Sequence, residues 1–462
     1  MLIPSKAQTR SASANGRILH AALVAMLAGV AVKAIAIGKE VAVAGVFGRS
    51  EELEAYLAAA LIPGLLINLF AETMNQALIP TLVRVREQDG AEAAQRLFSS
   101  ALLCLCLLLC AVSLGMAFAA PDFLPLISWN YSPGKLHLAI RLFYGLLPLV
   151  ILGGISSMCA AVLNTCERFA IPTLAPALVP LMILAGSLLW GRNAGIWAVV
   201  WASLLGGLLQ TVCMASLMGR QGYAFRPMGL VRTEAAVEVA RQYGPLILSS
   251  LVASGGLLVD QAMAAMLPAG SVSALAYAGR FTSVAMMILG GALSTALTPY
   301  ISQMTAQQDW ASCRHILRNW LGIAALVSAP IALVLIAGAP ALIRLTLQHG
   351  AFHDADSQAV APVLAMYAIQ VPFFVVSRVF YRFLLALRRT DLIFYCGAIN
   401  LALDVVLNLV LMRCMGVAGI ALATSLWTVS TLIFLGYWTR RLLSQPEPFK
   451  KEKTRKGMEA ST

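Results

Sequence analysis

The stretch NQALIP at residues 75–80 is repeated in altered form about 220 residues later, as STALTP at residues 294–299. A similar interval separates two further matches, Leu147-Pro148 from Val371-Pro372 and Ala194-Gly195-Ile196 from Ala418-Gly419-Ile420. Many transporters are built from duplicated halves that enclose a substrate site. The repeat therefore predicts two similar lobes and favours transport as the function.

The composition places these lobes in a membrane. The chain has 462 residues, of which 60% are hydrophobic and 12% charged, with a mean hydropathy of +0.81; soluble domains have about 25% charged residues. A membrane span needs about 20 apolar residues, and twelve such stretches lie near residues 18–46, 55–83, 97–119, 138–163, 170–190, 195–217, 240–267, 272–303, 317–342, 360–387, 392–412 and 417–439. We expect an all-α integral membrane protein with about twelve transmembrane helices, in two pseudo-symmetric six-helix lobes around a central cavity.

The polar stretches between the apolar ones give the domain boundaries. We expect a first lobe over residues 1–217, a cytoplasmic linker over 218–239, a second lobe over 240–440 and a basic cytoplasmic tail over 441–462. Because each lobe holds an even number of helices, both lobes have the same orientation in the membrane. The two halves are then related by a parallel pseudo-twofold axis.

The 33 Lys and Arg residues are distributed unevenly along the chain. If the N-terminus is cytoplasmic, 23 of them lie in the tails and the even-numbered connections, whereas six lie on the other side: Arg49, Lys135, Arg141, Arg192, Arg344 and Arg413. Cytoplasmic loops of membrane proteins carry this excess, so both termini are expected in the cytoplasm. The net charge of +12 is explained by these loops, and no nucleic-acid-reading module accompanies it.

The sequence gives little support for an enzymatic function. The five histidines lie in tails, connections or span ends without metal-ligand spacing, the nine cysteines show no metal-type pairing, and no glycine-rich loop precedes a helix. We expect no catalytic site, metal or cofactor. A polar segment precedes the first apolar stretch and no small-residue cleavage pattern follows it, so the first helix is expected to be retained.

Charged residues inside spans are the candidates for function, because each costs at least about 2.5 to 3.5 kcal/mol to insert. The candidates are Lys33, Lys39, Glu40, Asp260, Arg280, Arg378 and Asp404. Lys33 and Arg280 are expected to bind substrate, whereas Lys39 and Glu40 either do so or form an ion pair. Asp260 either pairs with Arg280 or Lys33 or contacts substrate directly. Several cations in an apolar setting suit an anion such as pyrophosphate.

Seven segments together resemble the lipid II flippases of the MurJ/MviN type, within the superfamily of multidrug, oligosaccharidyl-lipid and polysaccharide exporters. In order along the chain they are GKEVAVAGVFG (38–48), IPGLLINLFAET (62–73) followed by QALIP (76–80), LNTCERFAIP (163–172), GSVS (270–273), YAGR (277–280), HGAF (349–352) and GVAGIALA (416–423).

The resemblance implies alternating access by two lobes that carry a polyprenyl-pyrophosphate-linked sugar to the outer leaflet of the bacterial inner membrane. It places the family's cationic site positions on Lys33, Lys39 and Arg280 and an acidic one on Glu54. The chain has lysines where the family usually has arginines, Ile67 in place of a further arginine, and twelve expected helices where known members have about fourteen. It thus resembles a divergent member, whose glycan is lipid II or a related lipid-linked oligosaccharide.

The expected partners are this substrate and membrane lipids, with a coupling ion as a further candidate, and the protein is expected to act as a monomer. Two other functions remain open from the sequence. An ion-coupled exporter of the multidrug type would use a buried carboxylate in the first lobe. A membrane scaffold for a polysaccharide synthase would have its central cavity filled by side chains.

Overall fold

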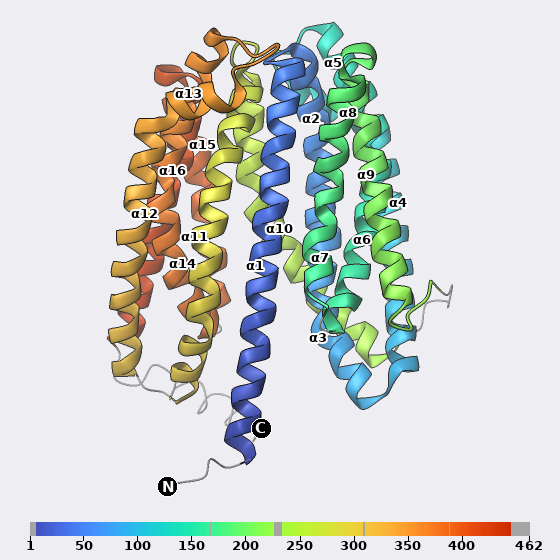
Figure 1. Ribbon diagram of the computed structural model, residues 1–462, viewed down its shortest axis with the longest axis vertical. Helices are drawn as coiled ribbons and strands as arrows, with labels where there is room; N and C mark the ends of the chain where they lie inside the picture. Colours follow the sequence, from blue (N-terminus) through green and yellow to red (C-terminus); the bar gives the residue numbers. More distant parts are fainter. Residues whose placement is uncertain (1–5, 167, 226–232, 308–309, 388, 445–462) are drawn as a thin grey trace, which may run out of the picture.

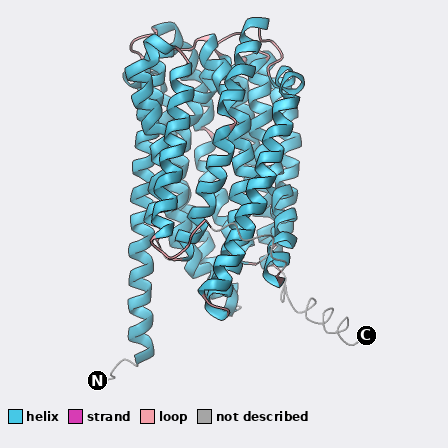
Figure 2. Ribbon diagram, turned by 90° about the vertical axis from the view of Figure 1, so that its right-hand side faces the viewer, coloured by secondary structure: helices cyan, strands magenta, loops and turns pink. Residues whose placement is uncertain are grey.

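The computed structural model describes residues 6–166, 168–225, 233–307, 310–387 and 389–444. Within these ranges the chain is helical and contains no strand (Figure 2). The elements of the first half are α1 (Lys6–Phe47), α2 (Glu51–Leu66), the π-helix η1 (Ile67–Glu72), α3 (Thr73–Gln88), α4 (Ala91–Ile127), α5 (Pro133–Leu146), α6 (Pro148–Thr165), α7 (Ala170–Leu174), the 3-10 helix η2 (Ala175–Ala177), α8 (Leu178–Ala194) and α9 (Trp197–Gly219).

The second half comprises α10 (Glu234–Ala265), α11 (Ser271–Gln307), α12 (Trp310–Leu347), α13 (Asp354–Ala368), α14 (Gln370–Ala386), α15 (Thr390–Met415) and α16 (Val417–Leu443). Several consecutive elements join into single spans, such as α2–η1–α3 and α5–α6. Eleven spans of the described chain are long and apolar enough to cross a membrane, and the 42-residue α1 runs beside them. The all-α membrane architecture with two six-helix lobes, expected from the sequence, is confirmed (Figure 1).

Local sequence signals account for the helix ends. Ser50 accepts a hydrogen bond from the amide of Leu53 at the start of α2, and Ser132 does the same for Lys135 at the start of α5. Such side chains satisfy amides that the first helical turn leaves unpaired. Pro148 is the first residue of α6, where its missing N–H costs nothing.

The connection between the lobes lies between the end of α9 at Gly219 and the start of α10 at Glu234, so the second lobe's first helix begins six residues before the expected boundary at 240. The last helix, α16, ends at Leu443. The expected basic tail falls outside the described residues from position 445 onwards.

Helices within a lobe approach closely at small residues. A Cβ added to Gly206 of α9 would lie 2.7 Å from the Cα of Val179 in α8, and one added to Gly255 of α10 would lie 2.9 Å from Leu401 in α15. In lipid, close packing of this kind holds helices together in place of a hydrophobic driving force.

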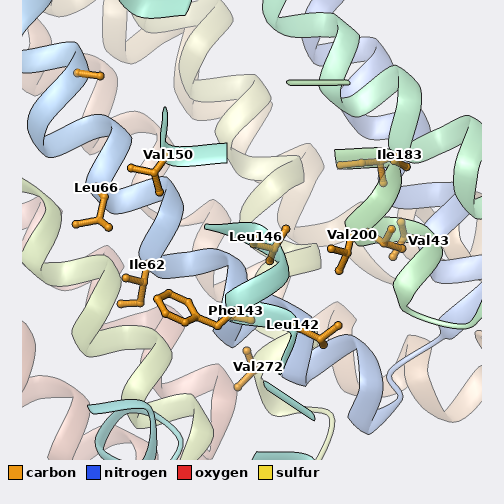
Figure 3. Close-up of a cluster of buried hydrophobic side chains, with 14 of the residues drawn as sticks. Val43, Ile62, Leu66, Leu142, Phe143, Leu146, Val150, Ile183, Val200 and Val272 are labelled. Atoms are coloured by element: carbon orange, nitrogen blue, oxygen red, sulfur yellow. The ribbon is translucent and has the colours of Figure 1, made fainter. Parts of the chain in front are cut away.

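One apolar cluster extends from the first lobe into the second. Figure 3 shows Ile62, Phe143 and Val150 of the first lobe together with Val272 at the start of α11. All four side chains are buried. The start of α11 is thus embedded in the core of the opposite lobe, which fixes the two lobes against each other at this end.

Candidate functional site

Three of the predicted site residues meet where α1 of the first lobe faces α11 of the second. The carboxylate of Glu40 lies 2.7 Å from the Nζ of Lys39 and 3.0 Å from the Nε of Arg280. Lys33 is partly buried about two turns before Glu40 on the same face of α1, and it lies close enough to Arg280 for the two cations to repel each other. Lys33, Lys39, Glu40 and Arg280 form what we call the charged cluster.

Exposure differs within the charged cluster. The side chain of Glu40 is 9% exposed and that of Lys39 is 16% exposed, whereas that of Arg280 remains 56% exposed. Arg280 therefore has a free face that can reach a further anion while it stays bound to Glu40. With three cations and one carboxylate, the cluster keeps a net positive charge that favours an anionic ligand.

Glu54 lies at the interface between the lobes. Its carboxylate pairs with the Nζ of Lys135 at 2.5 Å and accepts the amides of Val272 at 2.8 Å and Ser273 at 3.3 Å. The side chains of Glu54 and Lys135 are only 2% and 5% exposed. A carboxylate at a helix N-terminus is stabilised by the unpaired amides there. In this structure Glu54 thus joins α2 to the first turn of α11, and its contact with substrate stays a prediction.

Further bonds between the lobes surround Glu54 at the end of the molecule opposite the two termini (Figure 1). Arg49 donates to the carbonyl of Gly270 at 3.0 Å and lies 3.5 Å from Asp356. Tyr277 donates to the carbonyl of Gly48 at 2.9 Å, and the amide of Ala351 donates to the carbonyl of Gly45 at 2.8 Å. We call these contacts, together with those of Glu54, the seal.

The lobes also touch near the end that carries the termini, where α10 packs on α3 and α4. Tyr243 donates to the carbonyl of Phe70 at 2.9 Å, and Arg84 pairs with Glu238 through side chains that are 46% and 36% exposed. Exposed pairs of this kind contribute at most about 1 kcal/mol. The seal is therefore the more firmly closed of the two ends.

Asp260 lies inside the second lobe, away from the charged cluster. Its carboxylate accepts hydrogen bonds from the amide of Asn408 at 2.8 Å and the hydroxyl of Thr424 at 3.1 Å. Asn408 also donates to Asp404 at 3.3 Å, so two carboxylates share one amide group. The expectation that Asp260 pairs with Arg280 or Lys33 is corrected, because α15 and α16 supply its partners. Asp260, Asp404, Asn408 and Thr424 form what we call the acidic cluster.

Sequence reasoning missed Glu72. This carboxylate lies at the end of the π-helix η1 and lines a cavity of about 550 Å³ within the first lobe. It lies within an expected span, and the rule that a charge inside a span marks a functional candidate applied to it as it did to Lys33. Asn408 also had a signal, since it follows Asp404 by four residues and so shares a helix face with it.

Two six-helix lobes with a cationic cluster at their interface define a two-lobed membrane transporter. The family model described as "Lipid II flippase MurJ" matches residues 43–456. The chain belongs to the MurJ family of lipid II flippases, as its sequence predicts. This family is one of transporters and not of catalysts.

Individual relatives and solved structures agree with this assignment. The chain is 26% identical to a probable lipid II flippase MurJ of Buchnera aphidicola over 420 residues, covering 88% of this chain and 81% of the relative. It is 28% identical to the lipid II flippase MurJ of Burkholderia cenocepacia over 347 residues, covering 72% and 66%. Over 90% of its length it also superposes on a structure of lipid II flippase MurJ in an inward closed conformation, with a TM-score of 0.80, 22% identity and 87% of that chain covered.

The same fold occurs in multidrug transporters. An inward-facing transporter of the multidrug resistance MATE family superposes with a TM-score of 0.78 at 14% identity, covering 92% of this chain and 98% of the other. An outward-facing conformation of a transporter of that family gives a TM-score of 0.67.

Proposed function

We propose that the protein moves a polyprenyl-pyrophosphate-linked glycan, either lipid II or a related lipid-linked oligosaccharide, from the cytoplasmic to the outer leaflet of the bacterial inner membrane. The observation that carries this proposal is the charged cluster, in which Lys33 and Lys39 come from one lobe and Arg280 from the other. Membership of the lipid II flippase family supports the same substrate class.

Glu40 gives this cluster a way to respond to substrate. It binds Lys39 within its own helix and Arg280 across the lobe interface. A pyrophosphate carries more negative charge than one carboxylate and has more acceptor oxygens, so it competes with Glu40 for the same cations. Arg280 is the exposed partner and is reached first. Transfer of Arg280 from Glu40 to the pyrophosphate then removes an ion pair that holds the two lobes together.

The direction of transport follows from the placement of the seal. The excess of basic residues in the loops near the termini supports a cytoplasmic location of both ends, so the seal faces the outside. Substrate enters from the cytoplasmic side once the contacts of α10 with α3 and α4 have separated. It leaves after the buried contacts of Glu54, Arg49 and Tyr277 have opened. Both halves of the charged cluster belong to one chain, which supports action as a monomer.

The acidic cluster is our candidate for the site of a coupling ion. Asp260 and Asp404 are 6% and 1% exposed, and they lie close enough to repel each other when both are ionised. An oxygen of Asp404 and the amide oxygen of Asn408 are buried without a hydrogen-bond partner. A monovalent cation, or a proton on one carboxylate, would relieve this repulsion and use the free oxygens.

Competitive native mass spectrometry of the purified protein tests the substrate. Lipid II, a shorter polyprenyl-pyrophosphate sugar and a cationic drug are offered together to the wild type and to Lys39→Ala and Arg280→Ala. Each variant should retain either pyrophosphate lipid at least about tenfold less, because a hydrogen bond to a charged group contributes about 1.5 to 3 kcal/mol.

Arg344→Ala is the matched control, because Arg344 has the same 56% exposure as Arg280 and also pairs with a carboxylate, Asp354 at 3.4 Å. It lies outside the charged cluster and should retain lipid normally. Preference for the drug, unchanged in the Lys39 and Arg280 variants, would refute the flippase proposal in favour of a multidrug exporter.

A further inference from the structure

The cavity that Glu72 lines lies within the first lobe, between α2–η1–α3, α6, α7–α8 and α9. Its lining residues are Ile67, Glu72, Asn75, Leu149, Leu152, Gly153, Ser156, Ser157, Ala160, Asn164, Pro172, Thr173, Pro176, Val179, Gly207, Gln210, Thr211 and Met214. All belong to one lobe, and the set does not include any member of the charged cluster. We call it the first-lobe pocket. Its volume of about 550 Å³ is in the range of small-molecule sites.

The π-helix η1 brings Glu72 to this pocket. In a π-helix the residues five apart are hydrogen-bonded neighbours, so Ile67 and Glu72, its first and last residues, both lie on the pocket side. Turns of this type inside α-helices are rare and occur frequently at functional sites.

The hydrogen bonds inside the first-lobe pocket engage its donor groups and leave amide oxygens as acceptors without a partner. Asn75 donates its amide nitrogen to Ser157 at 3.4 Å, and Ser157 donates to the carbonyl of Ala71 at 3.3 Å. The amide oxygen of Asn75 remains buried without a partner. Gln210 donates its nitrogen to Ser156 at 2.9 Å, which leaves its amide oxygen as an acceptor.

Glu72 is the one charged side chain in the pocket lining, all of which belongs to the described chain. The pocket thus presents a carboxylate and amide oxygens and lacks a cationic partner of its own. The side chain of Glu72 is exposed, so a cation that enters the pocket can reach its carboxylate. A bare metal ion would leave most of the volume unfilled, whereas an organic group with several N–H donors and a positive charge matches both the volume and the acceptors.

We propose that the first-lobe pocket binds a primary ammonium group, with Glu72 as its counter-ion and the amide oxygen of Gln210 as a hydrogen-bond acceptor. The ammonium belongs either to the headgroup of the transported lipid, in which case the inference rests on the proposed function, or to a free organic amine. Both sources share this chemistry and are separated by experiment.

The first experiment compares two probes of nearly equal size in the full-length protein. Glucosamine carries an ammonium group at pH 6.5 where glucose carries a hydroxyl. Equilibrium dialysis should show that the wild type binds glucosamine at least about tenfold more tightly, since a charge-assisted bond contributes about 1.5 to 3 kcal/mol. Glu72→Gln should lose this preference. Glu51→Gln, which alters an exposed carboxylate outside the pocket, should keep it.

A second variant tests the pocket independently, so that the result does not depend on whether Glu72→Gln folds normally. Ala160→Met fills part of the pocket without removing any hydrogen-bonding group, so it should also weaken glucosamine binding. Equal binding of glucose and glucosamine, a preference that survives Glu72→Gln, or unchanged binding in Ala160→Met would each overturn the proposal.

The second experiment identifies the source of the ammonium. Two pyrophosphate lipids that differ only in a free or an acetylated amine on the headgroup are compared by native mass spectrometry. If Glu72→Gln removes a preference for the free amine, the headgroup is the ligand. If neither lipid is preferred while glucosamine binding still depends on Glu72, the ligand is a free organic amine.

The two proposals fail independently. Arg280→Ala should lower the retention of both lipids and leave glucosamine binding unchanged. Normal lipid retention in Arg280→Ala would refute only the pyrophosphate site. Glucosamine binding that is unchanged in Glu72→Gln would refute only the ammonium site.

Discussion

Glu40 shows how a single carboxylate can organise a cationic site. Without it, Lys39 and Arg280 would bring like charges together across the lobe interface. With Glu40 present, Lys39 and Arg280 each have a carboxylate partner when no substrate is bound. In the proposed mechanism a pyrophosphate first contacts the exposed face of Arg280 and then displaces this carboxylate.

Glu40→Gln tests this competition. The variant should bind a soluble pyrophosphate such as geranyl pyrophosphate more tightly, because the competing charge is gone. Since Arg280 is 56% exposed, the pair contributes about 0.2 to 1 kcal/mol, which corresponds to a gain of up to about fivefold. Isothermal titration would measure it. Weaker binding would show that Glu40 positions the cations and does not compete for them.

The buried pair of Glu54 and Lys135 predicts a different outcome. Glu54→Gln leaves the ammonium of Lys135 buried without a counter-ion, and such a loss costs about 3 to 5 kcal/mol. Thermal melts in detergent should show a clear loss of stability. Glu54→Gln combined with Lys135→Met removes both charges and should recover most of it. No recovery would show that the amides of α11, and not Lys135, account for the stabilisation by Glu54.

At the scale of the helices, the seal depends on close backbone contact between α1 and the segment before α13. Gly350 has a φ of +62°, and a Cβ there would lie 2.0 Å from the carbonyl oxygen of Gly45. Only glycine adopts this conformation at such a short approach without cost. The helix ends that meet in the seal can therefore close only if this position has no side chain.

Gly350→Ala should prevent full closure of the seal. Dipolar broadening in continuous-wave electron paramagnetic resonance of spin labels near positions 49 and 356 should report a longer distance than in the wild type. Gly90→Ala is the matched control, because Gly90 also has a positive φ, +88°, and has no atom near its added Cβ. With a ψ of 177° Gly90 also lies in a region that is essentially restricted to glycine, so Gly90→Ala carries backbone strain without the clash. An unchanged distance in Gly350→Ala would show that the seal tolerates a side chain there.

The helices could be predicted from the sequence, whereas the contacts between them could not. Length and hydropathy predicted the spans, and the repeat predicted two lobes. The partners of Asp260 are 148 and 164 residues away, on α15 and α16, and those of Glu54 lie at the start of α11. Such pairs depend on how the helices pack, which cannot be inferred from a single sequence. Glu72 could be identified from the sequence as a charge within a span. The pocket that it lines is formed by residues far apart in the sequence and could not be predicted.

For the whole molecule, the decisive question is which end faces the cytoplasm. Reporter fusions near positions 90 and 228 should be cytoplasmic, and fusions near 130 and 350 should be outside. This outcome follows from the excess of basic residues in the connections on the side of the termini. Reversed reporters would invert the proposed direction of transport, because the seal would then face the cytoplasm.

The bonds of the seal have a consequence for comparative genomics. The hydrogen bonds of Arg49, Tyr277 and Ala351 end on the carbonyl oxygens of Gly270, Gly48 and Gly45, and Glu54 binds two main-chain amides. Every residue except proline supplies the same N–H and C=O groups. Apart from the Arg49–Asp356 pair, substitutions on one side of the seal thus impose little selection on the other. Contact maps derived from residue covariation should recover the interior of each lobe and underestimate the closed state.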